Sequence, residues 1–95
     1  MRRNLNRDDA EEIAIRGLGF LAGDPERLGH FLSVTGLGPE NLRMAAQEPK
    51  FLASVLDYIA SDESLLVALA GHSGIAPERV GQAHVLLAGP TKGHD

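Results

Sequence analysis

A glycine that ends one helix, followed by a proline that starts the next, occurs twice in this chain and strongly constrains its fold. The stretch FLSVTGLGPENL (residues 31–42) returns in altered form as LAGHSGIAPERV (residues 69–80). Gly36 and Gly74 stand where a helix should end, because glycine adopts the left-handed conformation of a helix C-terminus at little cost. The proline three residues later has the fixed φ that suits the first residue of a new helix. Each stretch therefore predicts a sharp corner between two helices.

The similarity extends beyond the corners. Asp24 and Asp62 hold equivalent positions upstream. Asp24 is expected to cap the second helix, and Ser61 or Asp62 the fifth. We interpret residues 24–47 and 62–88 as two similar helix–corner–helix units, joined by a further helix that starts at Pro49. The alternative is that Gly-x-x-Pro is simply a common way to turn between helices.

The rest of the chain also follows helical spacing, without the period-two alternation of strands. The sequence predicts an all-α, single compact domain over residues 1–95, ordered over about 8–88, with a mobile head 1–7 and tail 90–95. The apolar run 65–70 (LLVALA) predicts that the fifth helix is central. Six short helices are expected, starting near Asp8, Pro25, Pro39, Pro49, Glu63 and Pro77, with the last one ending at Gly89-Pro90.

Composition and net charge exclude or disfavour several classes of function. Nine lysines and arginines against thirteen aspartates and glutamates give a net charge of −4, which disfavours general binding to nucleic acid or anionic membranes. The chain has no cysteine, so disulfides, thiolate metal sites and thiol nucleophiles are excluded. The first residues lack the apolar run of a signal peptide, and a location in the cytoplasm is expected.

Two stretches resemble a known family. FLAGDPERLGHFLSVTGLGPENLR (residues 20–43) and FLASVLDYIASDESLLVALA (residues 51–70) are similar to a family of small bacterial proteins, mainly alphaproteobacterial, named domain of unknown function 3572. The similarity spans roughly residues 10–83. It implies a helical fold and a bacterial cytoplasm, and it transfers no activity and no catalytic residue. Gly17 and Gly19 stand where the family favours alanine, which predicts a looser end of the first helix.

Surplus apolar residues favour a partner-binding or adaptor role. The first helix carries Ile15 and Phe20 outside its main apolar stripe, and the last carries Val85 and Leu86 outside its own. Such residues can form a docking groove or a self-association face. The alternative is that the core absorbs them all. We expect Leu18 to belong to the core, and Val85 to be the more exposed of the two positions.

The second corner also fits the spacing of a DNA-binding helix-turn-helix over residues 70–88. Arg79 and Gln82 would then face DNA from the second helix. Phosphate contacts normally need several cations, and this helix offers one arginine. DNA binding is therefore the second hypothesis.

A small enzyme or ligand carrier is the third hypothesis, although no motif in the sequence supports it. No catalytic residue, cofactor site or metal site is predicted. The glycine-rich stretch 17–23 lies inside a predicted helix and follows no strand, and the stretch 89–93 lacks phosphate-binding spacing. No two histidines are four residues apart, as a metal site on a helix would require. His84 falls in register with Val80 and Leu87, which is typical of a histidine at the edge of a core.

Overall fold

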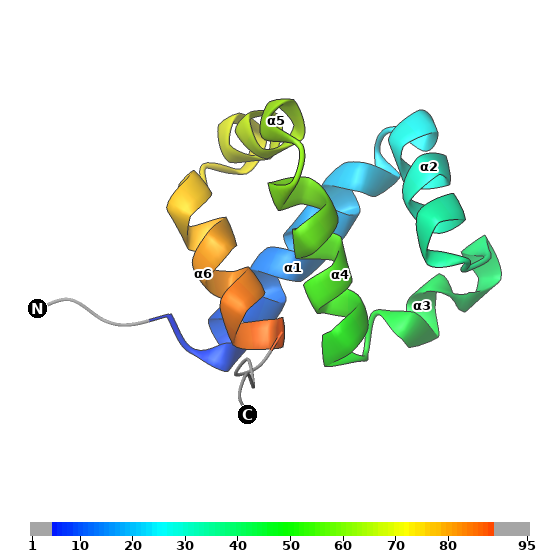
Figure 1. Cartoon of the computed structure of the whole chain (residues 1–95), viewed down its shortest axis with the longest axis horizontal. Coiled ribbons are helices and arrows are strands. Elements are labelled where there is room, and N and C mark those ends of the chain that lie inside the picture. The colour runs from blue at the N-terminus through cyan, green and yellow to red at the C-terminus, as the bar shows by residue number, and fades with distance from the viewer. Residues whose placement is uncertain (1–4, 89–95) are drawn as a thin grey trace, which may run out of the picture.

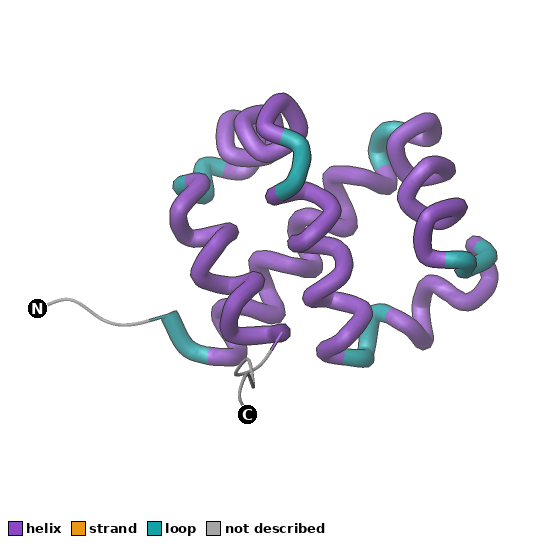
Figure 2. The backbone as a smooth tube through the Cα atoms, viewed as in Figure 1, coloured by secondary structure: helices purple, strands orange, loops and turns teal. Residues whose placement is uncertain are grey.

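The computed structural model describes residues 5–88, apart from the side chain of Pro39. Over this range it contains six α-helices and a 3₁₀ turn, and no strand, so the predicted all-α class is confirmed. Figure 1 labels the α-helices and Figure 2 shows the short loops between them. The elements are α1 (Arg7–Ala22), α2 (Pro25–Thr35), η1 (Pro39–Asn41), α3 (Leu42–Ala45), α4 (Pro49–Ala60), α5 (Glu63–Ser73) and α6 (Pro77–Ala88).

Helices α1, α2 and α5 start where a side chain caps the first turn. The backbone N–H of Asp9 donates to the Asn6 side chain at 2.8 Å, and the Asp9 carboxylate accepts from the backbone N–H of Asn6 at 3.3 Å. Asp24 and Asp62 cap α2 and α5 in nearly the same backbone conformation, with φ and ψ of −126° and 96° against −125° and 104°. Leu5 packs against the core. Residues 1–4 of the predicted mobile head, the predicted mobile tail 90–95 and the predicted helix end at Gly89-Pro90 lie outside the described residues.

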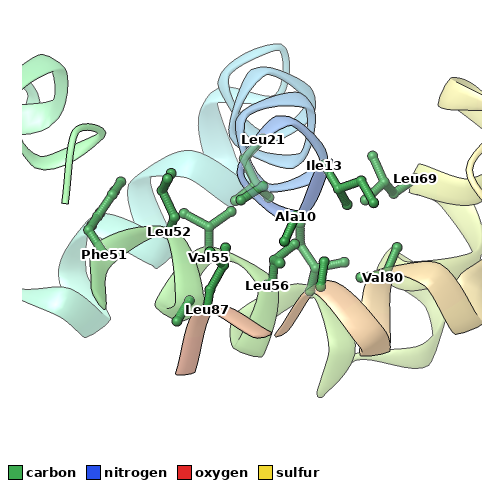
Figure 3. Packing of buried hydrophobic residues seen from close by; sticks show 14 of the residues in the cluster. Ala10, Ile13, Leu21, Phe51, Leu52, Val55, Leu56, Leu69, Val80 and Leu87 are labelled. Atoms are coloured by element: carbon green, nitrogen blue, oxygen red, sulfur yellow. The ribbon is translucent and has the colours of Figure 1, made fainter. Parts of the chain in front are cut away.

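The core lies among α1, α4 and α6, which make the most extensive contacts with one another. Figure 3 shows side chains from these three helices pointing toward one another. Ala10 of α1, Leu56 of α4 and Val80 of α6 are completely buried. In Figure 1, α5 and α6 lie on one side of α4, and α2 and α3 lie on the other. The radius of gyration is 13.1 Å, which is that of a compact domain of about 100 residues.

Helix α5 is not central, contrary to the prediction from its apolar run. Only Leu65 and Leu69 are buried, whereas Val67 is 58% exposed. One face of α5 packs against α4 and α1, and its outer face, which includes Val67, lies in solvent. Helix α4 takes the central place instead, with six buried residues against two in α5.

The two glycines of the first helix do not interrupt it, and one of them allows close packing. Helix α1 continues through both to Ala22, and Gly17 is buried. A Cβ at Gly17 would lie 2.8 Å from Cδ1 of Ile59, which is itself fully buried, whereas a Cβ at Gly19 would meet nothing within 4 Å. Gly17 therefore lets the backbone of α1 approach α4 closely.

The helical segment that follows the first corner is shorter than predicted. A 3₁₀ turn over Pro39–Asn41 precedes a single α-helical turn in α3, which contains no buried residue. The next proline, Pro49, already starts α4, so the segment has room for little more than two turns.

No helix within residues 5–88 is long and apolar enough to cross a membrane.

Candidate functional site

The surface between α2 and α4 is hollowed at two adjacent places. Two depressions of about 480 and about 420 Å³ share Tyr58 and Ser61, and we call them together the α2–α4 groove. The groove exists because α2 packs mainly against α1, and its backbone makes only weak contact with α4. The residues that line it are Glu26, Arg27, His30, Phe31, Val34 and Thr35 from α2, Ser54, Asp57 and Tyr58 from α4, and Ser61 and Asp62 from the loop that follows.

An aromatic cluster forms the base of the groove. The ring of Phe31 packs edge-on against Tyr58 with centroids 5.1 Å apart, and it lies 5.7 Å from the ring of Phe51. Phe31 is buried and Tyr58 is half-buried. Three of the four aromatic residues of the chain thus join α2 to α4. Aromatic pairs of this geometry add about 0.5–1.5 kcal/mol beyond area burial.

One side-chain hydrogen bond crosses the groove. Nδ1 of His30 and the hydroxyl of Tyr58 are 2.6 Å apart. The two rings are tilted at 45° with centroids 5.7 Å apart. Because His30 is exposed, this bond can exchange with water or with a bound group, and the two side chains can contact a ligand without leaving an unsatisfied buried atom behind.

The walls carry more negative than positive charge. Glu26, Asp57 and Asp62 contribute carboxylates. Arg27 is the one arginine or lysine among the lining residues, and its Nε lies 3.2 Å from Oδ2 of Asp24. Asp57 also lies 3.7 Å from Nε2 of His84 on α6, which places His84 at the edge of the core as its register predicts.

Above the base, the groove also offers exposed apolar surface. Val34 is 64% exposed and lies on the flank of α2 that faces the groove. It stands outside the Phe31 and Leu32 stripe by which α2 packs. An exposed valine beside a half-buried tyrosine is apolar area that a partner can cover.

The four residues predicted for partner binding differ in their exposure to solvent. Ile15 and Val85 are exposed, at 52% and 67%. Phe20 and Leu86 are half-buried and pack against the core, and the Phe20 ring lies 5.3 Å from that of His72. Ile15 and Phe20 are five residues apart, which places them about 140° apart around the helix. Leu18 is half-buried against the core, as expected.

The surroundings of the second corner carry no surplus of positive charge. Arg79 and Gln82 are both exposed on α6. Arg79 lines a shallow depression of about 220 Å³ together with Asp9, Glu12 and Arg16 of α1, so two carboxylates offset two guanidinium groups. Arg16 is paired with Glu12 at 3.0 Å. The helix-turn-helix hypothesis gains no support from this arrangement.

The groove does not resemble a known catalytic arrangement. A nucleophile normally needs an adjacent base that a third group orients. Within residues 5–88, the His30 ring contacts Tyr58, and no further group holds its other nitrogen. No set of three or more histidine, aspartate or glutamate side chains suited to hold a metal ion occurs in the same range.

Sequence reasoning missed His30, Val34 and Tyr58 as site residues. A signal for Val34 was present, because it is apolar and lies outside the stripe of its helix, the criterion that selected Ile15 and Val85. No sequence signal brings His30 and Tyr58 together, since they lie on helices that are not consecutive.

The fold and groove define a small all-α protein with a surface cleft between two helices. Residues 7–90 match a protein family of unknown function, DUF3572, and the chain belongs to this family. The resemblance predicted from residues 20–43 and 51–70 is thereby confirmed. Comparisons with curated proteins and with solved structures find no match.

Proposed function

We propose that the chain is a non-enzymatic protein-interaction module, an adaptor that holds a segment of another protein in the α2–α4 groove. The observation that carries this proposal is the combination of hollow shape and exposed apolar surface at one place. Tyr58 and Val34 lie together in the groove, and Val34 is 64% exposed. Grooves between helices commonly bind helical or extended segments of partners.

The lack of a positively charged surface around Arg79 favours this role over DNA binding. A DNA-binding surface needs several cations to replace the counterions of the phosphate backbone. The groove lacks such a cation surplus, and so does the depression around Arg79. We further propose that the chain works in the bacterial cytoplasm, as its sequence predicts, and immunoblotting of cell fractions tests this location.

Two valines of similar exposure provide a matched test. Val34 lies in the groove, and Val85 lies on the outer face of α6 at 67% exposure. We expect Val34→Ser to abolish capture of the partner from a lysate of the source organism, and Val85→Ser to leave capture unchanged. Both variants should unfold within about 0.5 kcal/mol of the wild type, because exposed sites contribute little to stability.

The opposite pattern decides against the groove. Loss of capture in Val85→Ser with normal capture in Val34→Ser would move the interaction surface to α6, where the sequence predicted it. Capture that neither substitution alters would remove the structural basis of the proposal. Denaturant midpoints of both variants show whether a loss reflects unfolding.

A further inference from the structure

We infer that the α2–α4 groove binds a basic amphipathic helical segment of its partner. This inference rests on the proposed function, and it adds the chemistry of the partner. Its evidence is the charge along the walls of the groove, together with the position and length of the apolar base.

The charges on the walls are complementary to a basic segment. Glu26 and Asp62 line one part of the groove, and Asp57 lines the other. The positive charge of Arg27 is offset by the carboxylate of Asp24, 3.2 Å away. An acidic partner would therefore meet three carboxylates, whereas lysines and arginines of a basic partner would approach them from solvent.

The apolar base accounts for the amphipathic character of the segment. The half-buried Tyr58 lies at the base over the buried ring of Phe31, and Val34 projects beside it with 64% of its surface exposed. A segment that carried charge alone would leave this apolar area in water. One or two apolar side chains that face the base, flanked by cations that face the walls, satisfy both parts of the surface.

The length of the groove indicates how much of a helix it can hold. From Glu26 to Val34 along α2, and from Ser54 to Asp62 past the end of α4, the chain advances eight residues. Eight residues of helix correspond to about 12 Å, or about two turns. A bound helix would therefore place anchors at i and i+3 or i+4 on the base, which is the usual pattern of helix-in-groove recognition.

The test uses peptides selected without assumptions about charge. Random peptides of about 15 residues are displayed and selected on the immobilised full chain, and binders are kept if Val34→Ser weakens them and Val85→Ser does not. We expect the retained peptides to be enriched in lysine and arginine beside spaced apolar residues. Their affinity should fall as salt rises from about 50 to about 500 mM, because exposed charge pairs are screened.

Variants of the chain that lack carboxylates then test whether the acidic walls of the groove attract these peptides. The double variant Glu26→Gln, Asp57→Asn should weaken these peptides by about tenfold, as expected for the loss of several exposed charge pairs. The control Glu78→Gln removes an exposed carboxylate of α6, outside the groove, and should leave affinity unchanged. Circular dichroism of each variant confirms that the fold is retained.

Each alternative outcome has a distinct meaning. Retained peptides that are acidic or uncharged, or that bind the double variant as tightly as the wild type, overturn the inference and leave the proposed function standing. Selection that yields no peptide sensitive to Val34→Ser overturns both the inference and the proposed function.

Discussion

The α2–α3 corner and the α5–α6 corner are nearly identical up to their glycines. Helices α2 and α5 each contain 11 residues and begin at a capping aspartate. Each is followed by a glycine with a φ of 78°, and ψ is 13° at Gly36 and 8° at Gly74. The equivalent residues Phe31 and Leu69 both point into the core and are fully buried. Local sequence is sufficient to specify this half of each unit.

Beyond the glycines the two corners diverge. Helix α6 has 12 residues and buries Val80, Ala83 and Leu87, whereas α3 has four residues and buries none. Leu42 and Val80 hold the same position in the repeat, but Leu42 is half-buried and Val80 is completely buried. The element that follows a corner therefore depends on what it can pack against.

This difference opens the groove. Helix α6 packs against both α1 and α4 and closes that side of the core. Helix α3 does not close the opposite side in the same way, so α2 is joined to α4 mainly by the aromatic cluster, and the α2–α4 groove lies over it. Two similar units thus provide a closed side and an open side of one small molecule.

The largest expected effects on stability test helices α2 and α5, the parts of the two units that are alike. Phe31→Ala and Leu69→Ala should each lower the free energy of unfolding by about 3–4 kcal/mol, because both remove a fully buried large side chain. Chemical denaturation measures both values. A cost below about 1 kcal/mol at either position would show that α2 or α5 is not anchored as the comparison requires.

The next largest effects on stability test helices α3 and α6, the parts of the two units that differ. Val80→Ala should cost about 2 kcal/mol, and Leu42→Ala about 1 kcal/mol or less, although leucine loses more atoms than valine does. The reason is that Leu42 keeps part of its surface in water. If Leu42→Ala were the more destabilising of the two, α3 would be as deeply packed as α6 and the contrast between the corners would disappear.

The corner glycines should show equal and smaller effects. Gly36→Ala and Gly74→Ala should each destabilise by about 1 kcal/mol, because a side chain is forced into a left-handed conformation. A Cβ at either glycine would meet nothing within 4 Å, so the whole cost is conformational. Thermal or chemical unfolding compares the two directly. Stabilisation by either substitution would contradict the assigned backbone conformation.

The smallest effect concerns the residue before each glycine. At the first corner the N–H of Leu37 donates to the carbonyl of Leu32 at 3.1 Å, whereas at the second the N–H of Ile75 donates to Oγ of Ser73 at 3.3 Å. Ser73→Ala should therefore cost about 0.5 kcal/mol, and the equivalent Thr35→Ala should leave the Leu37 bond intact. Hydrogen exchange at the two amides distinguishes the cases: unchanged protection of Ile75 in Ser73→Ala would mean that the hydroxyl is not its partner.

Much of the fold could be predicted from sequence because its signals are local. Asp24, Asp62, Pro49 and the two corner glycines each mark a helix boundary through their own backbone preferences, and the structure places boundaries at all of them. The close approach at Gly17 could not be predicted, because it depends on Ile59 of a distant helix. The outer position of α5 was missed because an apolar run does not reveal which of its faces a small core can cover.

The candidate site was harder to predict, because it depends on contacts between separate helices. The outward position of Val85 could be inferred from its place around its own helix. The contact of Phe20 with His72 and the bond between His30 and Tyr58 each join separate helices, and the spacing of residues within one helix carries no information about such pairs.

The central claim is that a partner occupies the open side of the molecule, and site-specific cross-linking in cells tests it most directly. A photoreactive phenylalanine analogue is placed at Val34 in one variant and at Val85 in another, since both positions are exposed to a similar extent. The account predicts a discrete cross-linked product from position 34 and none from position 85. The reverse pattern, or equal products from both positions, would contradict docking in the α2–α4 groove.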